Sequence, residues 1–256
     1  MKILTIGDIV GLKSVDYLCD RLFRIKSELG IDLTVANGEN ATEIHGISKR
    51  EALAVFDAGV DVITLGNHAF GQRDICELLS EDYNIIRPAN YPSLVPGIGH
   101  IIVKHKGKRI LCMNVLGNAL MDAMACPFAT VDEILDSEKG NYDLSILDIH
   151  AETTSEKIAL ARYFDGRINI IFGTHTHVQT ADEQILPRGT GYITDLGMTG
   201  PQNSVIGTNV ASVIEKFRTK MPTRFTVGDG EIRAHCALFE IDDETNKVKS
   251  VRRVRF

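Results

Sequence analysis

The sequence predicts a layered α/β protein, built as one domain over residues 1–256. Short apolar runs of strand length alternate along the chain with amphipathic stretches of helical length, a pattern typical of this class. The 256 residues are enough to bury a large core, and 44% hydrophobic and 24% charged residues is an ordinary globular composition. We therefore expect a mixed sheet, or two packed sheets, at the centre of the domain.

Strands and helices alternate through the first third of the chain. The expected elements are strands at 2–7, 32–36 and 61–65 and helices at about 15–29, 48–58 and 72–80. The first helix places Leu18, Leu22 and Ile25 on one face and ends at Gly30, which suits the left-handed conformation at helix ends.

The rest of the chain is expected to begin and end with antiparallel strand pairs. The first pair covers 100–115 with its turn at Gly107-Lys108, and the last covers about 232–256. Between them we expect strands at 143–149, 168–172 and 192–195 and helices near 130–137, 153–164 and 204–217. Thr153 and Glu156 match a capping box, which predicts where the second of these helices starts.

Charge and cysteine content limit the partners and the location. The formal net charge of -6 argues against an extended nucleic-acid groove, and the basic run at 252–255 is better interpreted as an edge strand. The five cysteines are scattered and form no Cys-x-x-Cys pair, as expected in a reducing cytoplasm. No apolar stretch reaches transmembrane length, and Gly7-Asp8 interrupts the first one too early for a signal peptide. We therefore expect a soluble cytoplasmic protein with no membrane partner.

Polar side chains follow five of the predicted strands, at the point where each strand ends. The carboxyl ends of parallel strands meet at one edge of a sheet, where ligands bind. The candidate functional residues at these ends are Asp8, Glu39, Asn40, Asn67, His68, His150, His175 and His177. Carboxylates, amides and imidazoles should therefore converge at one edge.

Each of these residues has an ordinary structural alternative. Asp8 could cap a turn, Asn67 could cap a helix, and His150 could be a hydrogen-bonded core histidine. Glu39 and Asn40 could belong to an exposed loop. Their joint occurrence after five strands, in a chain with 8 histidines, instead favours a metal site. Mixed oxygen and nitrogen ligands suit Mn, Fe or Zn, and the number of ligands predicts two ions that share a carboxylate.

Other motifs carry less weight. Residues 7–14 resemble a phosphate-binding loop, but Leu12 stands where a glycine must precede the lysine. No dinucleotide fingerprint follows a strand, and no serine-hydrolase elbow is present. His45 follows the Glu39 loop, so whether it lines the pocket stays open. His100, His105 and His235 fall in predicted strands away from the candidate residues.

The order of these motifs resembles the calcineurin-like metallophosphoesterase superfamily, whose fold is a sandwich of two mixed β-sheets flanked by helices. Two segments depart from its usual pattern: Asp8-Ile9-Val10 lacks the histidine of Asp-x-His, and Gly38-Glu39-Asn40 stands where most members have Gly-Asp. Both departures are similar to the YmdB family of bacterial phosphodiesterases. That similarity continues through 66–68, 150–157, 173–180 and 195–201, so it spans nearly the whole chain.

The resemblance implies a centre with two divalent or mixed-valence metal ions, Fe or Mn, with Zn as a further option. Glu39 would bridge the two ions. Asp8, Asn40 and His177 would complete one ligand set, with Asn40 in place of the missing histidine, and Asn67, His150 and His175 the other. His68 would be the general acid. The resemblance also implies that the chain forms a homo-oligomer.

The resemblance implies hydrolysis of a small phosphodiester, specifically a 2′,3′-cyclic nucleotide. The expected nucleophile is a hydroxide that the two metal ions activate. His68 would protonate the leaving alkoxide. Thr199 and Gly200, in the glycine-rich segment 197–201, could contact the phosphate.

Two alternative functions stay open. The same site could hydrolyse phosphomonoesters, as in a nucleotidase or protein phosphatase, or a regulatory protein could bind metal or nucleotide without turnover.

Overall fold

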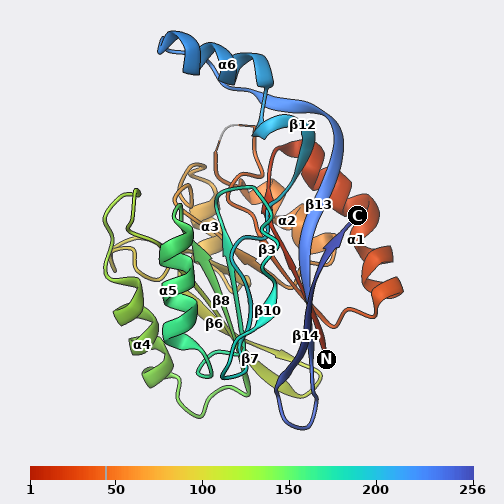
Figure 1. Cartoon of the computed structure of the whole chain (residues 1–256), viewed down its shortest axis with the longest axis vertical. Coiled ribbons are helices and arrows are strands. Elements are labelled where there is room, and N and C mark those ends of the chain that lie inside the picture. Colours follow the sequence, from red (N-terminus) through yellow and green to blue (C-terminus); the bar gives the residue numbers. More distant parts are fainter. Residues whose placement is uncertain (44) are drawn as a thin grey trace.

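The computed structural model describes residues 1–43 and 45–256, and in these residues two β-sheets pack face to face (Figure 1). The first sheet contains β1 (Lys2–Ile6), β2 (Asp8–Ile9), β3 (Leu33–Asn37), β4 (Val62–Thr64), β5 (Ile85–Ile86), β12 (Met198–Thr208), β13 (Val227–Ile241) and β14 (Val248–Arg255). The second contains β6 (His100–His105), β7 (Lys108–Leu116), β8 (Leu144–His150), β9 (Ile170–Thr174), β10 (Gln184–Ile185) and β11 (Gly191–Ile193). The helices are α1 (Leu12–Leu29), α2 (Lys49–Asp57), α3 (Ile75–Leu79), α4 (Pro127–Ser137), α5 (Thr154–Phe164) and α6 (Val210–Thr219).

Both sheets combine parallel and antiparallel neighbours. The strand order is β2-β12-β13-β1-β3-β4-β5 in the first sheet, where β14 pairs with β13, and β10-β11-β9-β8-β7-β6 in the second. The parallel strands β1, β3 and β4 of the first sheet, and β7, β8 and β9 of the second, form the central parts. The predicted sandwich of two mixed β-sheets with flanking helices is thereby confirmed.

Three apolar layers hold the sandwich together. The helices α1, α2 and α3 cover the outer face of the first sheet, where Leu22 and Val55 are fully buried. Ile3, Phe172 and Phe239 fill the space between the sheets. On the other side, α4 and α5 cover the second sheet through residues such as Phe164. Buried apolar area of this kind is the main stabilising contribution to a fold of this size, and it places the strand ends of both sheets on one rigid frame.

The structure corrects the expected elements at the turn after β6 and in the segment before α6, and it adds the two-residue strands β2, β5 and β10 that the sequence pattern did not predict. The turn between β6 and β7 is Lys106-Gly107, both with positive φ (47° and 79°), and not Gly107-Lys108. Residues 204–208, expected as helix, belong to β12, and α6 begins only at Val210. The sequence pattern missed β12 because Gly200, Pro201 and Gly207 interrupt it. The register between β12 and β13 shifts after Pro201 and again between Asn203 and Thr208, the stretch that contains Gly207.

An arm formed by residues 202–231 extends from the first sheet. It consists of the outer parts of β12 and β13 with α6 at its tip, and α6 projects away from the rest of the molecule (Figure 1). Along α6, only Val213 is buried, whereas Ile214 and Phe217 are exposed. Over the described residues, no helix is long and apolar enough to cross a membrane.

The start of α5 differs from the predicted capping box. Thr153 is the N-cap residue, but its hydroxyl makes no capping hydrogen bond. Glu156 turns away from the cap and accepts hydrogen bonds from the backbone N–H groups of Asn118 (2.9 Å) and Ala119 (3.1 Å). The carboxylate thus fixes the loop after β7 to α5, a contact between distant segments that a local motif cannot reveal.

This correction yields a stability prediction. Glu156→Ala should lower the free energy of unfolding by about 1–3 kcal/mol, because two backbone donors lose a charged acceptor. Thr153→Val should change it by less than about 0.5 kcal/mol, because no capping bond is lost. Urea unfolding of both variants measures the difference. A larger loss of unfolding free energy in Thr153→Val than in Glu156→Ala would contradict this and support the predicted capping box.

Candidate metal centre

The candidate residues occupy the carboxyl ends of strands from both sheets. Asp8 follows β1 after one glycine, Glu39 and Asn40 follow β3, and Asn67 and His68 follow β4. In the second sheet, His150 is the last residue of β8, and His175 and His177 follow β9. Because the two sheets are packed together, these ends face one another, as the strand pattern predicted.

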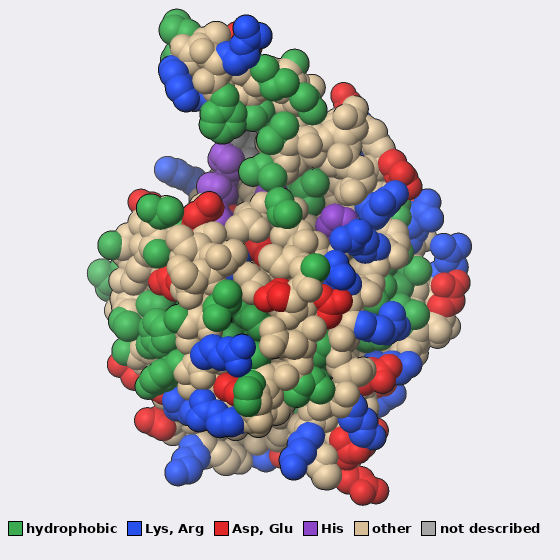
Figure 2. All heavy atoms as spheres, in the orientation of Figure 1, with side chains coloured by type: hydrophobic (Ala, Val, Ile, Leu, Met, Phe, Trp, Pro, Cys, Tyr) green, Lys and Arg blue, Asp and Glu red, His purple; other side chains and the backbone are tan. Residues whose placement is uncertain are grey.

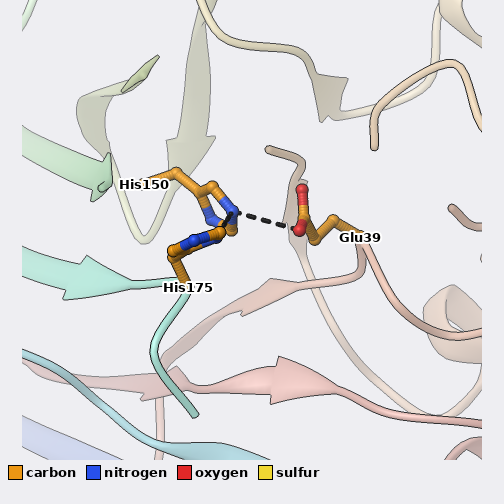
Figure 3. A group of neighbouring side chains, drawn as sticks. All are labelled: Glu39, His150 and His175. Atoms are coloured by element: carbon orange, nitrogen blue, oxygen red, sulfur yellow. Dashed lines mark hydrogen bonds and ion pairs between the residues drawn. The ribbon is translucent and has the colours of Figure 1, made fainter. Parts of the chain in front are cut away.

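Four side chains meet around the Nε2 atom of His150. Glu39 Oε1, Asn67 Oδ1 and His175 Nδ1 each lie 3.1 Å from it. Figure 3 shows His150, His175 and Glu39 directed toward one another from three separate segments. Glu39, His150 and His175 offer ligand atoms within 4.8 Å of one another, so they could hold a metal ion. The amide oxygen of Asn67 adds a fourth donor on the same side.

A second group lies beside the first. Asp8 is completely buried and its Oδ2 accepts a hydrogen bond from the backbone N–H of His175 at 3.2 Å. Its Oδ1 has no hydrogen-bond partner among the described residues and lies 3.7 Å from His177 Nε2. Asn40 Nδ2 lies 3.2 Å from the same histidine nitrogen. Asp8, Asn40 and His177 therefore form a set of donors around a buried carboxylate oxygen.

Each of the three candidate ligand histidines, His150, His175 and His177, has one ring nitrogen beside an acceptor oxygen and the other directed toward the centre. Thr174 donates its hydroxyl hydrogen to Asp148 (2.7 Å), so its oxygen accepts from His150 Nδ1 (2.8 Å). His177 Nδ1 donates to the carbonyl of Ile206 (2.8 Å). His175 Nε2 lies 3.0 Å from a Glu152 carboxylate oxygen. Such contacts select the tautomer whose free lone pair can bind a metal.

The buried charges shift one another's pKa. Burial alone would raise the pKa of Glu39, but the charge and hydrogen bond of His150 outweigh it and lower that pKa to about 2. Burial likewise opposes the charge on His150, yet Glu39 and Asp8 raise its pKa to about 9. Burial raises the pKa of Asp8 to about 6. Burial and the neighbouring His150 lower the pKa of His175 to about 3.

The chemistry of this donor set fits divalent cations. Two carboxylates, Asp8 and Glu39, are almost wholly buried, and no Lys or Arg is among the described residues that line the cavity beside them. Buried carboxylates require a positive partner, and Asp8 Oδ1 has no hydrogen bond to satisfy it. Carboxylate, amide and imidazole donors together suit first-row transition metals better than calcium.

A buried polar network around Asp148 holds His150 through Thr174. Asp148, two residues before it in β8, accepts hydrogen bonds from Thr174 and Asn37 (3.0 Å to Asn37 Nδ2) and from the Thr64 hydroxyl. The sequence pattern does not reveal these residues as part of the site. Their strand positions placed them in a core, and only the packing of β3 and β4 of the first sheet against β8 and β9 of the second brings them together.

The segment 175–177 is held in an unusual conformation. His175 and His177 have φ values of 94° and 63°, which L-residues rarely adopt. Thr176 between them donates both its backbone N–H (3.3 Å) and its hydroxyl (2.8 Å) to Asp195. Asp195 is in turn paired with the fully buried Lys157 at 2.6 Å. This ion pair therefore fixes the backbone that presents both histidines, a role the sequence analysis also missed.

Gly66 allows the close approach of Glu39 and His150. A Cβ atom at this position would lie 2.0 Å from Glu39 Oε2 and 2.3 Å from His150 Nε2. Glu39 Oε2 also accepts the backbone N–H of His68 at 3.1 Å. Any side chain at residue 66 would thus fill the centre itself, which explains the glycine after β4.

A cavity of about 320 Å³ opens from the centre. Glu39, Asn40, His68, His175 and His177 line it, and the ring of His68 stacks on that of His45 with 4.1 Å between centroids. His45 also lines the cavity, which answers the question the sequence left open. Figure 2 shows histidine side chains in the hollow between the arm and the body of the molecule.

The expected phosphate contacts from segment 197–201 are not found. Thr199 is fully buried in β12, where it pairs with both β2 and β13, and neither Thr199 nor Gly200 lines the cavity. The cavity wall on this side comes from residues 206–208 and 225–227 instead. The glycine-rich sequence suggested a loop, but strand pairing turned it inward.

Comparisons with known proteins agree on one family. Residues 4–254 match the family described as YmdB-like protein. The chain is 39% identical over 254 residues to the 2′,3′-cyclic-nucleotide 2′-phosphodiesterase of Bacillus subtilis, covering 99% of this chain and 96% of that protein. It superposes on a Thermus thermophilus protein with a TM-score of 0.95 and 37% identity (100% and 99% covered). It also superposes on the crystal structure of a Mycoplasma pneumoniae protein described as a novel phosphatase, with a TM-score of 0.94 and 34% identity. That match covers 100% of this chain and 93% of the other.

The role of Gly66 can be tested by metal content. Gly66→Ala should abolish metal retention, because its methyl group would collide with Glu39 and His150. Gly140→Ala is the control: it has a positive φ of 84° with nothing within 4 Å, so it strains the backbone without touching the centre. Elemental analysis of both purified variants gives the result. Full metal content in Gly66→Ala would contradict the predicted collision.

The buried ion pair can be tested by a double-mutant cycle. Lys157→Met should lower the free energy of unfolding by about 3–5 kcal/mol, because Asp195 is left as an unpaired buried charge. The double variant Lys157→Met, Asp195→Asn should recover part of this loss, since no charge remains. Urea unfolding measures the stability, and calorimetric titration with Mn²⁺ should show weaker binding in both variants. The single variant Asp195→Asn completes the cycle. A double variant less stable than both single variants would exclude charge pairing as the cause.

Proposed function

Because the chain belongs to the family of YmdB-like proteins, we propose that it is a binuclear metal-dependent phosphodiesterase acting on 2′,3′-cyclic nucleotides. The observation that carries this proposal is the convergence of Glu39, Asn67 and His175 on His150 Nε2 at 3.1 Å, beside the unpartnered oxygen of Asp8. The activity named for the 39% identical Bacillus subtilis relative supports the substrate class.

The residues of the two sets would hold two ions. Glu39 would bridge them, because its carboxylate lies between the two sets: Oε1 is 3.1 Å from His150 Nε2 and 3.3 Å from Asn40 Nδ2. Asn67, His150 and His175 would complete one set, and Asp8, Asn40 and His177 the other. Fe or Mn fits these donors best, with Zn as a further option. When bound, two such ions acidify water and neutralise the charge on a phosphoryl group.

His68 is the proposed general acid. It lies half-buried in the cavity next to Asn67, and its ring is held by stacking on His45. Burial lowers its pKa, so the protonated ring is a stronger acid than a free imidazolium. A proton from His68 to the leaving alkoxide completes cleavage of one ester bond of the cyclic diester and gives a nucleoside monophosphate.

Location and assembly follow as further parts of the proposal. The five cysteines are free thiols, two of them buried, which supports a reducing cytoplasmic location. Self-association and the absence of an extended nucleic-acid groove stay predictions from the sequence. One domain over residues 1–256 is supported by the continuous apolar layers from both outer helical faces to the space between the sheets.

The substrate class is tested by parallel assays. The purified protein loaded with Mn²⁺ is assayed with 2′,3′-cyclic AMP, bis-p-nitrophenyl phosphate and p-nitrophenyl phosphate. We expect hydrolysis of both diesters with a kcat/KM at least about 100-fold above that for the monoester. A faster monoester reaction would instead support a phosphomonoesterase, in line with the description of the Mycoplasma pneumoniae protein as a phosphatase. If none of the three compounds is hydrolysed, the result would support the alternative of a regulatory protein that binds metal or nucleotide without turnover.

The length of the Glu39 side chain gives a second prediction. Glu39→Asp keeps the charge but withdraws the carboxylate by one methylene, so it should no longer reach both ions. We expect metal content to fall from two ions per chain to one or fewer, and kcat/KM for 2′,3′-cyclic AMP to fall at least about 100-fold. Glu28→Asp, on the exposed face of α1, is the control. Unchanged metal content in Glu39→Asp would remove Glu39 from the bridging role.

A further inference from the structure

The cavity beside the candidate metal centre has two unlike walls. One wall carries the carboxylates, amides and imidazoles of the strand ends. The opposite wall belongs to the arm and presents Ile206 and Phe225, which are 51% and 50% exposed. Hydrophobic side chains of the arm are visible next to the hollow in Figure 2. The proposed chemistry at the phosphate uses none of these apolar groups.

The arm wall is fixed relative to the metal centre. Thr208 pairs with Val227 in the β12–β13 ladder, and the N–H of Asn209 donates to the carbonyl of Thr226 at 2.9 Å. Gly207 is seated so tightly on Val10 that a Cβ there would lie 2.7 Å from Val10 Cγ1. The carbonyl of Ile206 holds His177 Nδ1 at 2.8 Å, so one end of the wall is bonded directly to a candidate ligand.

We propose that Phe225, together with Ile206, forms the nucleobase subsite of this protein; this rests on the proposed function. A cyclic nucleotide has an anionic phosphate at one end and a flat aromatic base at the other. The phosphate belongs at the metal centre, so the base must extend away from it along the cavity. An exposed aromatic ring on the opposite wall is the group on which a base stacks.

The space along the cavity fits a base at this position. Phe225 lines both the cavity of about 320 Å³ at the metal centre and an adjoining one of about 600 Å³. His45 and Glu43 line both as well, so the two spaces meet beside Phe225. Such volumes are within the range of small-molecule sites. Because stacking uses the face that every base has, the subsite should accept all four bases.

A second exposed phenylalanine on the arm provides a matched control. Phe217 in α6 is 68% exposed but is not among the residues lining either cavity. A surface that served to bind another copy of this chain would use both phenylalanines, because both are exposed on the same arm. A base subsite uses Phe225 alone.

The test compares substrates with and without a base. Wild type, Phe225→Ala, Phe225→Tyr and Phe217→Ala are assayed with 2′,3′-cyclic AMP and with ribose 2′,3′-cyclic phosphate, which lacks the base. In Phe225→Ala, the ratio of kcat/KM between the two substrates should fall about tenfold to a hundredfold, through a higher KM for 2′,3′-cyclic AMP. Phe225→Tyr keeps the ring and should retain the wild-type ratio, as should Phe217→Ala.

The outcomes separate this proposal from the proposed function. An unchanged ratio in Phe225→Ala, with both substrates hydrolysed, overturns the subsite and leaves the phosphodiesterase intact. Equal losses in Phe225→Ala and Phe217→Ala, with a smaller mass by light scattering, overturn it in favour of a contact between copies of the chain. Should the wild type hydrolyse neither substrate, calorimetric titration with adenosine 3′-monophosphate decides. Binding weakened in Phe225→Ala alone supports the subsite, and binding unaffected by that variant overturns it.

Discussion

The contact between Glu39 and His150 is the interaction on which the rest of this structure depends. A carboxylate and an imidazole, each at most 1% exposed, lie 3.1 Å apart at the junction of the two sheets. Neither charge is stable there alone, because burial removes its hydration. Each charge stabilises the other, and both groups face the side chains of Asn67 and His175. Asn67 and His175 meet this buried pair, and the glycine after β4 is required by it, because a Cβ at Gly66 would collide with both Glu39 and His150.

Two groups of buried polar residues hold the candidate ligand histidines in position. The Asp148 network holds the His150 ring from below, and the Lys157–Asp195 pair holds the backbone of the His175–His177 segment in a conformation with positive φ. Unfavourable dihedrals of this kind persist only where the surroundings impose them. The Asp148 network joins β8 and β9 of the second sheet to β3 and β4 of the first, and Lys157 reaches Asp195 from α5. The position of the histidines therefore depends on the packing of the two sheets and of α5 against the second.

The alternation of strands and helices, and hence the class of fold, could be predicted because apolar periodicity is a local property of the chain. The same holds for the candidate residues Asp8, Glu39, Asn67, His150 and His175, since each lies at the end of its strand or within three residues after it. The prediction failed for residues 197–208, where glycines and a proline suggested a loop and a helix. Pairing with β2 and β13 made this segment a strand, and pairing between distant segments leaves little trace in local sequence.

The sequence by itself indicated the candidate metal ligands, because their order along the chain is tied to the ends of successive strands. It determined the family resemblance for the same reason. Only the tertiary structure decided which atoms of these residues converge, that Lys157 and Asp195 fix the histidine segment, and that the arm closes one side of the cavity. These features depend on contacts between segments as far apart as Val10 and Gly207, which arise only when both sheets and the arm are assembled.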